Sequence, residues 1–207
     1  MGNFIVTIGR EYGSGGKEIG EKLAAKLGFN FYNKNLITET AKKTGIDEKL
    51  FEDVDERQKE SFWYTLAMGM LSSSDSLNSL TEIPTNEKLI LEQFKTIEQI
   101  AETENCVIVG RCSNHILKNR KNVINIFVYA PLENKIERIS RLYNLDEKET
   151  KKQIAKVEKE RRTYYNYFTN GEWGSKNDYD LCIDSSKLEI DEIVNFLYDY
   201  INLKMNR

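Results

Sequence analysis

Short apolar runs alternate along this chain with amphipathic segments of helical spacing. The first helical segment places Ile19, Leu23 and Leu27 on one face, and Gly28 follows where a left-handed helix cap is easiest. The apolar runs predict strands at Phe4–Ile8, Phe29–Tyr32, Cys106–Val109, Val123–Tyr129 and Tyr179–Asp184. Strands that alternate with helices are typical of a parallel sheet, so we expect a three-layer α/β fold with helices on both faces of the sheet.

A glycine-rich stretch joins the first predicted strand to the first predicted helix. Glycines at 13, 15 and 16 let the backbone approach an anion closely, and the start of the following helix adds the positive end of its dipole. Lys17 adds a mobile cation. The order of strand, glycine loop and helix therefore predicts a phosphate-binding loop.

Two nucleotide-binding patterns match this loop incompletely. When Gly16-Lys17 is aligned with the G-K of the Walker A pattern G-x-x-x-x-G-K-[ST], Glu11 stands at the first glycine and Glu18 at the hydroxyl that binds magnesium. The dinucleotide pattern G-x-G-x-x-G fails because Glu18 occupies its third glycine position. We therefore favour an unusual phosphate loop over a dinucleotide site.

Composition narrows the class of partner. The chain carries 30 lysines and arginines against 33 acidic residues, a net charge of −3, which provides no basic field for nucleic acid. No apolar run reaches the length of a membrane span, and no targeting segment precedes the first strand, so we expect a cytoplasmic protein. Three cysteines without C-x-x-C spacing predict neither disulfides nor a zinc site, and the single histidine, His115, leaves hydrolase chemistry poorly supported. Small molecules or proteins are the expected partners.

Two stretches interrupt the alternation. Residues 47–101 show mostly helical periodicity with a polar break at 72–81, and they predict a helical insertion over the edge of the sheet. Farther on, the basic segment Lys156–Arg162 leads into the aromatic, glycine-punctuated stretch Thr163–Gly174, which suits a lid. The alternative is a solvated helix followed by an aromatic loop that packs locally.

Arginines follow the predicted strands or lie in the basic segment. Arg111 comes directly after Val107–Gly110, Arg138 and Arg141 follow the strand that ends at Tyr129, and Arg161 and Arg162 close the basic segment. The carboxyl ends of strands are where a doubly wound sheet binds its ligands. Because phosphoryl transfer needs cations that hold two sets of phosphates in line, arginines from several segments favour that chemistry.

Five segments of the chain resemble the cytidylate-kinase-like proteins of the nucleoside monophosphate kinase group. These segments are Ile8–Ile19, Phe31–Ile37, Val107–Cys112, Glu158–Arg161 with Tyr164-Tyr165, and Tyr179–Ser185. The resemblance covers nearly the whole chain, and its first and third segments are the most specific. It implies a P-loop kinase core at residues 1–34, 104–150 and 178–207, a helical acceptor-binding insertion at about 35–103, and a lid at about 151–177.

The resemblance also implies an activity and the residues that carry it. The chain would transfer the γ-phosphoryl group of ATP, with Mg²⁺, to a nucleoside monophosphate, and cytidylate (CMP or dCMP) is the first expectation. The donor phosphates would be held by Gly13, Ser14, Gly15, Gly16 and Lys17. Lys17 and Arg161 would be catalytic, with Arg161 bridging the phosphates in transit. Arg111 would hold the acceptor nucleotide, and the other acceptor residues would be Tyr32, Asn33, Arg138 and Arg162.

The loop departs from that of cytidylate kinases, which reads G-P-S-G-A-G-K-G-T. A gap-free alignment puts Gly16 at the lysine and Glu18 at the threonine, and Asn33 stands where an aspartate is expected. Either Lys17 reaches the phosphates through a remodelled loop, or a neighbour such as Arg10 supplies the charge, or transfer is slow or absent. Arg10 and Glu18 therefore join the expected ATP-binding residues, and no side chain is assigned to a metal.

Two rival functions stay open. The first is a regulatory protein of the same architecture that binds nucleotide without turnover, and Glu18 at the hydroxyl position favours it. The second is a kinase of another small acceptor, because acceptor pockets are formed by loops that a shared fold does not fix.

Overall fold

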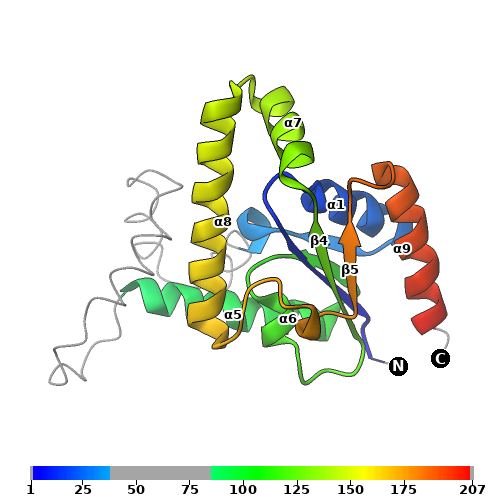
Figure 1. The fold of residues 1–207 in the computed structure, drawn as a ribbon. Coiled ribbons are helices and arrows are strands. Elements are labelled where there is room, and N and C mark those ends of the chain that lie inside the picture. Colours follow the sequence, from blue (N-terminus) through cyan, green and yellow to red (C-terminus); the bar gives the residue numbers. More distant parts are fainter. Residues whose placement is uncertain (1, 38–84, 206–207) are drawn as a thin grey trace, which may run out of the picture.

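A five-stranded parallel sheet forms the centre of the computed structural model, which describes residues 2–37 and 85–205. The strands lie in the order β2-β3-β1-β4-β5, so the first strand occupies the middle (Figure 1). Their bounds are β1 Ile5–Arg10, β2 Asn30–Tyr32, β3 Cys106–Val109, β4 Val123–Tyr129 and β5 Leu181–Asp184. All five predicted strands are present. The last begins at Leu181, so Tyr179 precedes the sheet instead of opening the strand.

One face of the sheet is covered by α1 (Gly16–Leu27) and α9 (Ile190–Met205). Their apolar sides enclose Val6, Ile8 and Ile126, which are fully buried. α1 ends as its sequence predicts, because Gly28 adopts φ 67° and its N–H bonds back to the last turn. The cluster on this face consists of apolar side chains and holds none of the predicted site residues.

The opposite face is covered by α5 (Thr85–Thr103) and the short α6 (Ser113–Ile116), whose neighbour Leu117 shares their core. Here Ile5, Ile97 and Ile108 are fully buried. The fold is thus the predicted three-layer α/β arrangement. Residues 38–84, which include most of the predicted helical insertion and its polar break, lie outside the described residues.

Two helices stand together beyond the carboxyl edge of the sheet. α7 (Leu132–Tyr143) begins directly after Pro131, and α8 (Glu147–Thr169) runs beside it and continues past the sheet towards α5 (Figure 1). α8 starts at Asp146, whose Oδ1 accepts the Glu149 N–H at 2.8 Å. The predicted basic segment is thus part of one 23-residue helix. A 3₁₀ turn, η1 (Lys176–Asp178), then returns the chain to β5.

Within residues 2–37 and 85–205, no helix combines the length and apolar character that crossing a membrane requires.

Candidate functional site

The glycine loop connects β1 to α1 at the carboxyl edge of the sheet. Gly13 and Gly15 have φ of 88° and 77°, and a Cβ atom at Gly13 would lie only 3.0 Å from Lys135 Cβ. Both positions therefore favour glycine for conformation and for space, since a Cβ atom at Gly15 would lie 2.9 Å from Ile190 Cδ1. Ser14 is buried; its hydroxyl donates to Glu11 O at 3.0 Å, and Ser185 Oγ donates to Ser14 O at 2.7 Å. These bonds fix the shape of the loop.

The inner surface of this loop consists of backbone N–H groups. The first hydrogen bond of α1 runs from Ile19 N to Gly15 O at 3.0 Å. None of the N–H groups of residues 15–18 donates to any residue that the structure describes. A run of N–H donors at the start of a helix fits an anion, which is the geometry that the sequence predicts for a phosphate loop. Phosphate binding itself stays a prediction.

The beginning of the loop is anchored through Glu11, the residue that replaces the first Walker glycine. Its N–H donates to Val128 O at 3.0 Å, and its Oε2 accepts from Ala130 N at 3.2 Å and from Lys135 Nζ at 2.9 Å. Lys135 is only 6% exposed, and it also binds Glu158 Oε1 at 2.7 Å. Although burial opposes its charge, the hydrogen bonds to Glu158 and Glu11 hold the pKa of Lys135 above its ordinary value. No motif in the sequence pointed to this pairing.

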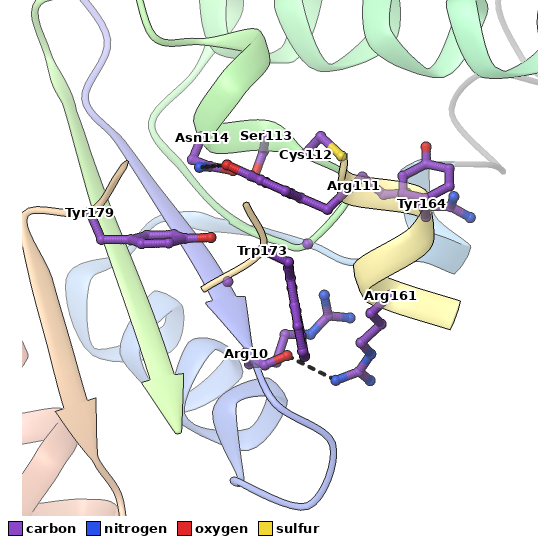
Figure 2. A pocket seen from close by; sticks show the side chains of 12 residues that line it. Arg10, Arg111, Cys112, Ser113, Asn114, Arg161, Tyr164, Trp173 and Tyr179 are labelled. Atoms are coloured by element: carbon purple, nitrogen blue, oxygen red, sulfur yellow. Dashed lines mark hydrogen bonds between the residues drawn. The ribbon is translucent and has the colours of Figure 1, made fainter. Parts of the chain in front are cut away.

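Beside the loop lies a cavity of about 60 Å³ that three arginines share. Arg10 is the last residue of β1, Arg111 follows β3, and Arg161 projects from α8 (Figure 2). The remaining lining residues are Gly9, Gly110, Cys112, Ser113, Asn114, Tyr164, Tyr165, Trp173 and Tyr179. None of the described residues that line the cavity is acidic. The described lining therefore gathers positive charge without a carboxylate, while Glu158 and Glu160 act on Arg161 from outside it.

Arg10 is held at the centre of this cluster. Its guanidinium lies against Gly110, because a Cβ atom at that glycine would be 1.9 Å from Arg10 Nη1. Arg161 Nη1 donates to Arg10 O at 3.0 Å. Burial lowers the pKa of Arg10 well below its ordinary value, and Arg161 and Arg111 lower it further. Burial also lowers the pKa of Arg161. An anion in the cavity would oppose these effects, so the site suits a phosphate group.

The turn that presents Arg111 is itself unusual. Gly110, Arg111 and Cys112 have φ of 83°, 58° and 54°, so three successive residues are left-handed. For Arg111 and Cys112 this conformation is strained, and such strain is concentrated at functional sites. The Arg111 guanidinium lies 5.3 Å from the centroid of the Tyr164 ring.

Aromatic residues close the cavity on its far side. Trp173 meets Phe127 edge to face with ring centroids 5.7 Å apart, and Tyr179 lies 5.0 Å from the same ring. Asn114 Nδ2 donates to Tyr165 Oη at 2.9 Å. Sequence reasoning assigned none of these residues to the site. Two signals were available: Tyr165 and Tyr179 belong to segments that resemble the cytidylate-kinase-like proteins, and Trp173 lies in the aromatic stretch after the basic segment.

Comparison with known proteins decides the family. The sequence model of the cytidylate kinase-like family matches residues 5–187. The chain belongs to the cytidylate kinase-like family. The resemblance that the sequence motifs indicate is thereby confirmed.

Individual relatives match nearly the whole length of the chain. A protein named cytidylate kinase from Methanocaldococcus jannaschii is 28% identical over 204 residues, which are 97% of this chain and 99% of that protein. The crystal structure of an uncharacterized protein from Eubacterium ventriosum has a TM-score of 0.72 at 27% identity and covers 97% of this chain and 99% of its own. Shikimate kinase from Bacteroides thetaiotaomicron has a TM-score of 0.55 at 14% identity, covering 96% of this chain and 98% of its own, and this likeness shows the fold alone.

For a member of the cytidylate kinase-like family, the predicted loop lysine occupies an unexpected place. Lys17 is the second residue of α1, its side chain is exposed, and it forms no ion pair with the described residues. Glu18 pairs with Arg138 and lies 3.6 Å from Lys22 Nζ. Arg138 thus lies over the loop, where a Cβ atom at Gly15 would be 3.3 Å from its Cζ. Glu18 and Arg138 are beside the loop but outside the arginine cavity.

The other predicted acceptor residues of this family member lie elsewhere. The Tyr32 hydroxyl donates to the Glu104 carboxylate. Asn33 Oδ1 accepts from the N–H groups of Asn35 and Leu36 at 3.0 and 3.2 Å, so it caps the helical turn at 34–37. Arg162 is exposed and stacks over Trp173 at 5.7 Å. Of the predicted arginines, only Arg10, Arg111 and Arg161 come together in one cavity.

Proposed function

We propose that this protein is an ATP-dependent phosphotransferase that moves the γ-phosphoryl group of ATP to a nucleoside monophosphate, with CMP or dCMP as the first acceptor to test. One observation carries the proposal: Arg10, Arg111 and Arg161 line a single cavity beside a loop of available N–H donors. Membership of the cytidylate kinase-like family and a relative named cytidylate kinase over 97% of the chain support it.

In the proposed reaction the donor and acceptor phosphates meet between the loop and the arginines. Residues 13–17 hold the donor phosphates through their N–H groups. Arg111 holds the acceptor phosphate, and Arg161 stabilises the charge that moves between the two. An oxygen of the acceptor phosphate forms the new bond to the γ-phosphorus while the bond to the β,γ-bridging oxygen breaks, so that ADP leaves.

We assign the cation of the loop to Arg10. Its guanidinium already lies in the cavity against Gly110, whereas the side chain of Lys17 is exposed. An arginine can contact two phosphate oxygens at once, which a lysine cannot do with the same geometry. Lys17 then contributes its N–H group and only long-range charge.

Magnesium would come to this site mainly on the nucleotide. In the described part of the chain no three His, Cys, Asp or Glu side chains cluster as a metal site, which fits an ion that is held by phosphates, water and one or two carboxylates. Glu18 stands at the position of the Walker hydroxyl, but it pairs with Arg138 and lies 3.6 Å from Lys22 Nζ, so we assign no side chain to the ion. When bound, the ion would neutralise charge on the phosphates.

The division of the chain follows from the same proposal. Residues 151–177 serve as the lid and residues 35–103 as the acceptor-binding insertion, of which 38–84 lie outside the described residues. Arg161 and Trp173 both belong to this lid and both line the cavity. Because ATP and nucleoside monophosphates are the substrates, the cytoplasm is the proposed location.

A coupled assay tests the proposal directly. The protein is incubated with ATP, Mg²⁺ and each nucleoside monophosphate in turn, and ADP production is followed. We expect turnover with CMP or dCMP, a loss of about 10²-fold or more in Arg10→Gln, and a much smaller loss in Lys17→Ala. Equal losses of activity in the two variants would contradict the assignment of the loop cation to Arg10. No turnover with any nucleotide would refute the proposed function.

A regulatory nucleotide-binding protein is the second candidate, favoured by the exposure of Lys17 and by Glu18 at the hydroxyl position. It predicts calorimetric binding of ATP that Mg²⁺ does not change, without product. A panel of non-nucleotide acceptors in the same assay separates a kinase of another small molecule from both.

A further inference from the structure

A buried ion cluster links three segments that are distant in sequence. Lys135, on the first turn of α7, binds Glu11 at the start of the glycine loop at 2.9 Å and Glu158 in the middle of α8 at 2.7 Å. The lysine side chain is 7% exposed, and those of Glu11 and Glu158 are 24% and 16% exposed. None of these three residues lines the arginine cavity, although Glu11 directly follows Arg10 and Glu158 lies close enough to raise the pKa of Arg161. The proposed chemistry gives the cluster no role.

On one side the cluster is fixed to the loop. Glu11 is held by two backbone bonds, its own N–H to Val128 O and its carboxylate to the N–H of Ala130. Lys135 itself packs against Gly13, since a Cβ there would meet both its Cβ at 3.0 Å and its carbonyl oxygen at 3.1 Å. The position of Lys135 is therefore tied to that of the loop at both Glu11 and Gly13.

On the other side the cluster is fixed to α8 one turn before a cavity arginine. Glu158 and Arg161 are three residues apart and share a helix face, so the rotation of α8 that brings Glu158 to Lys135 also brings Arg161 Nη1 to Arg10 O at 3.0 Å. Two further contacts agree with that rotation. Gln153 Nε2 donates to Tyr12 Oη at 2.9 Å, and Arg161 stacks over the Tyr12 ring at 5.5 Å.

We propose that Lys135 is a positioning residue that ties the glycine loop to α8 and thereby places Arg161 for phosphoryl transfer. This inference rests on the proposed function. Lys135 touches no phosphate; it acts through Glu158. With Glu158 bound, Arg161 stands over the end of the loop, and without that bond α8 is free to rotate or withdraw. Glu11 in place of the first Walker glycine then has a purpose, because glycine there would leave Lys135 without its loop partner.

Hydrogen exchange tests the link without any substrate. In Glu158→Gln the amides of α8 should exchange about tenfold faster than in the unaltered protein, while those of α9 stay unchanged, because only the tie between α8 and the loop is weakened. Lys151→Ala is the matched control, since among the described residues Lys151 pairs only with exposed Glu147 on the same helix. Unchanged exchange of α8 in Glu158→Gln would overturn the proposal.

Kinetics then test the action through Arg161. Glu158→Gln should lower kcat by about 10- to 100-fold with KM for ATP changed less than threefold, because a misplaced catalytic group affects turnover more than binding. In the Arg161→Lys background the same substitution should lower kcat less than threefold. Equal losses in both backgrounds would show that Glu158 acts independently and would refute the proposal.

Two precautions keep the outcomes distinct. If no acceptor is phosphorylated, the proposed function fails while hydrogen exchange still tests the link. A conservative variant tests Lys135 itself without removing its charge. Lys135→Arg retains both carboxylate partners and should keep kcat within tenfold of the unaltered protein. A larger loss of kcat with normal exchange of α8 would count against the link.

Discussion

The glycine loop lies between a buried lysine and a cluster of half-buried arginines. On one side Lys135 has two carboxylates within 2.9 Å, and their hydrogen bonds keep its pKa raised. On the other side Arg10, Arg111 and Arg161 share a cavity whose described lining holds no acidic residue, and burial lowers the pKa of Arg10 and Arg161. Carboxylates bind the first cation directly, whereas the described lining of the arginine cavity supplies none, and the two that raise the pKa of Arg161, Glu158 and Glu160, lie outside it.

The carboxylates around each cation indicate its role: Lys135, which has two, is structural, whereas the three arginines, whose cavity lining has none, are placed to bind a ligand. A buried ion pair is strongly destabilising when one partner is removed, because the other charge stays buried. Like charges gathered at a functional site are the reverse case, since they oppose folding and favour the ligand. The substitutions below test whether the two sets of cations differ in this way.

Neutralising one cation of each kind should give opposite results. Lys135→Met leaves Glu11 and Glu158 without their partner, so the free energy of unfolding should fall by about 3–5 kcal/mol. Arg10→Met removes a charge that two other arginines oppose, so stability without ligand should stay within about 1 kcal/mol of the unaltered protein or rise. Urea unfolding followed by circular dichroism measures both. A large loss in Arg10→Met would abolish the distinction.

Activity should depend on the cavity far more than on basic charge in general. Arg161→Ala should lower kcat about 10³-fold, the size of effect that an arginine at a transferring phosphoryl group has in other enzymes. The control is Arg141→Ala, on the exposed surface of α7, which should leave kcat within twofold. The assay with ATP and the best acceptor decides, and a loss of less than tenfold in Arg161→Ala would remove it from the site.

A comparison of Gly110→Ala with Gly28→Ala distinguishes the effect of backbone strain from the effect of displacing Arg10. Gly110 and Gly28 have φ of 83° and 67°, so alanine at either should lower the free energy of unfolding by about 1 kcal/mol. At Gly28 nothing lies within 4 Å of the new Cβ, whereas at Gly110 it would displace the Arg10 guanidinium. Only Gly110→Ala should therefore lower kcat. Equal activity of the two variants would show that Arg10 tolerates displacement.

The smallest effect concerns the cysteines. Burial raises the pKa of the Cys112 thiol to about 12, although Arg111 and Arg10 lower it, and burial also raises that of Cys106 to about 12. Thiolate is the reactive form, so alkylation of both should be slow at pH 8 and should accelerate as the pH rises. Exposed Cys182 should be modified first. Peptide mass spectrometry measures the order, and early modification of Cys112 would indicate a wet cavity in which the arginines are better solvated than we infer.

Local patterns predicted the backbone of this fold well. The strand runs and the glycine cap at Gly28 depend on neighbours in sequence, so their signals are complete within a few residues. The family resemblance likewise identified the cytidylate kinase-like family from contiguous motifs. The first two strands start one residue later than predicted, and the last starts two residues later, because Tyr179 packs on Phe127 before the chain enters the sheet.

Side-chain partners were much harder to predict. Lys135 meets Glu11 across 124 positions of sequence, and Arg138 meets Glu18 across 120, so nothing near either arginine or lysine in the chain signals its partner. Five basic positions look alike as sequence; Arg138 and Arg162 take other contacts, and only tertiary packing selects Arg111 and Arg161 for the cavity. Arg10 was expected only as an alternative to Lys17, because the exposure of Lys17 depends on where α1 begins.

In the left-handed turn at Gly110, Arg111 and Cys112, a substitution that relieves backbone strain is expected to lower catalytic activity. Replacing Cys112 by glycine would relieve an unfavourable backbone conformation, yet it would also remove a buried side chain and loosen the segment that aims Arg111. A less strained variant at that position would be a poorer catalyst.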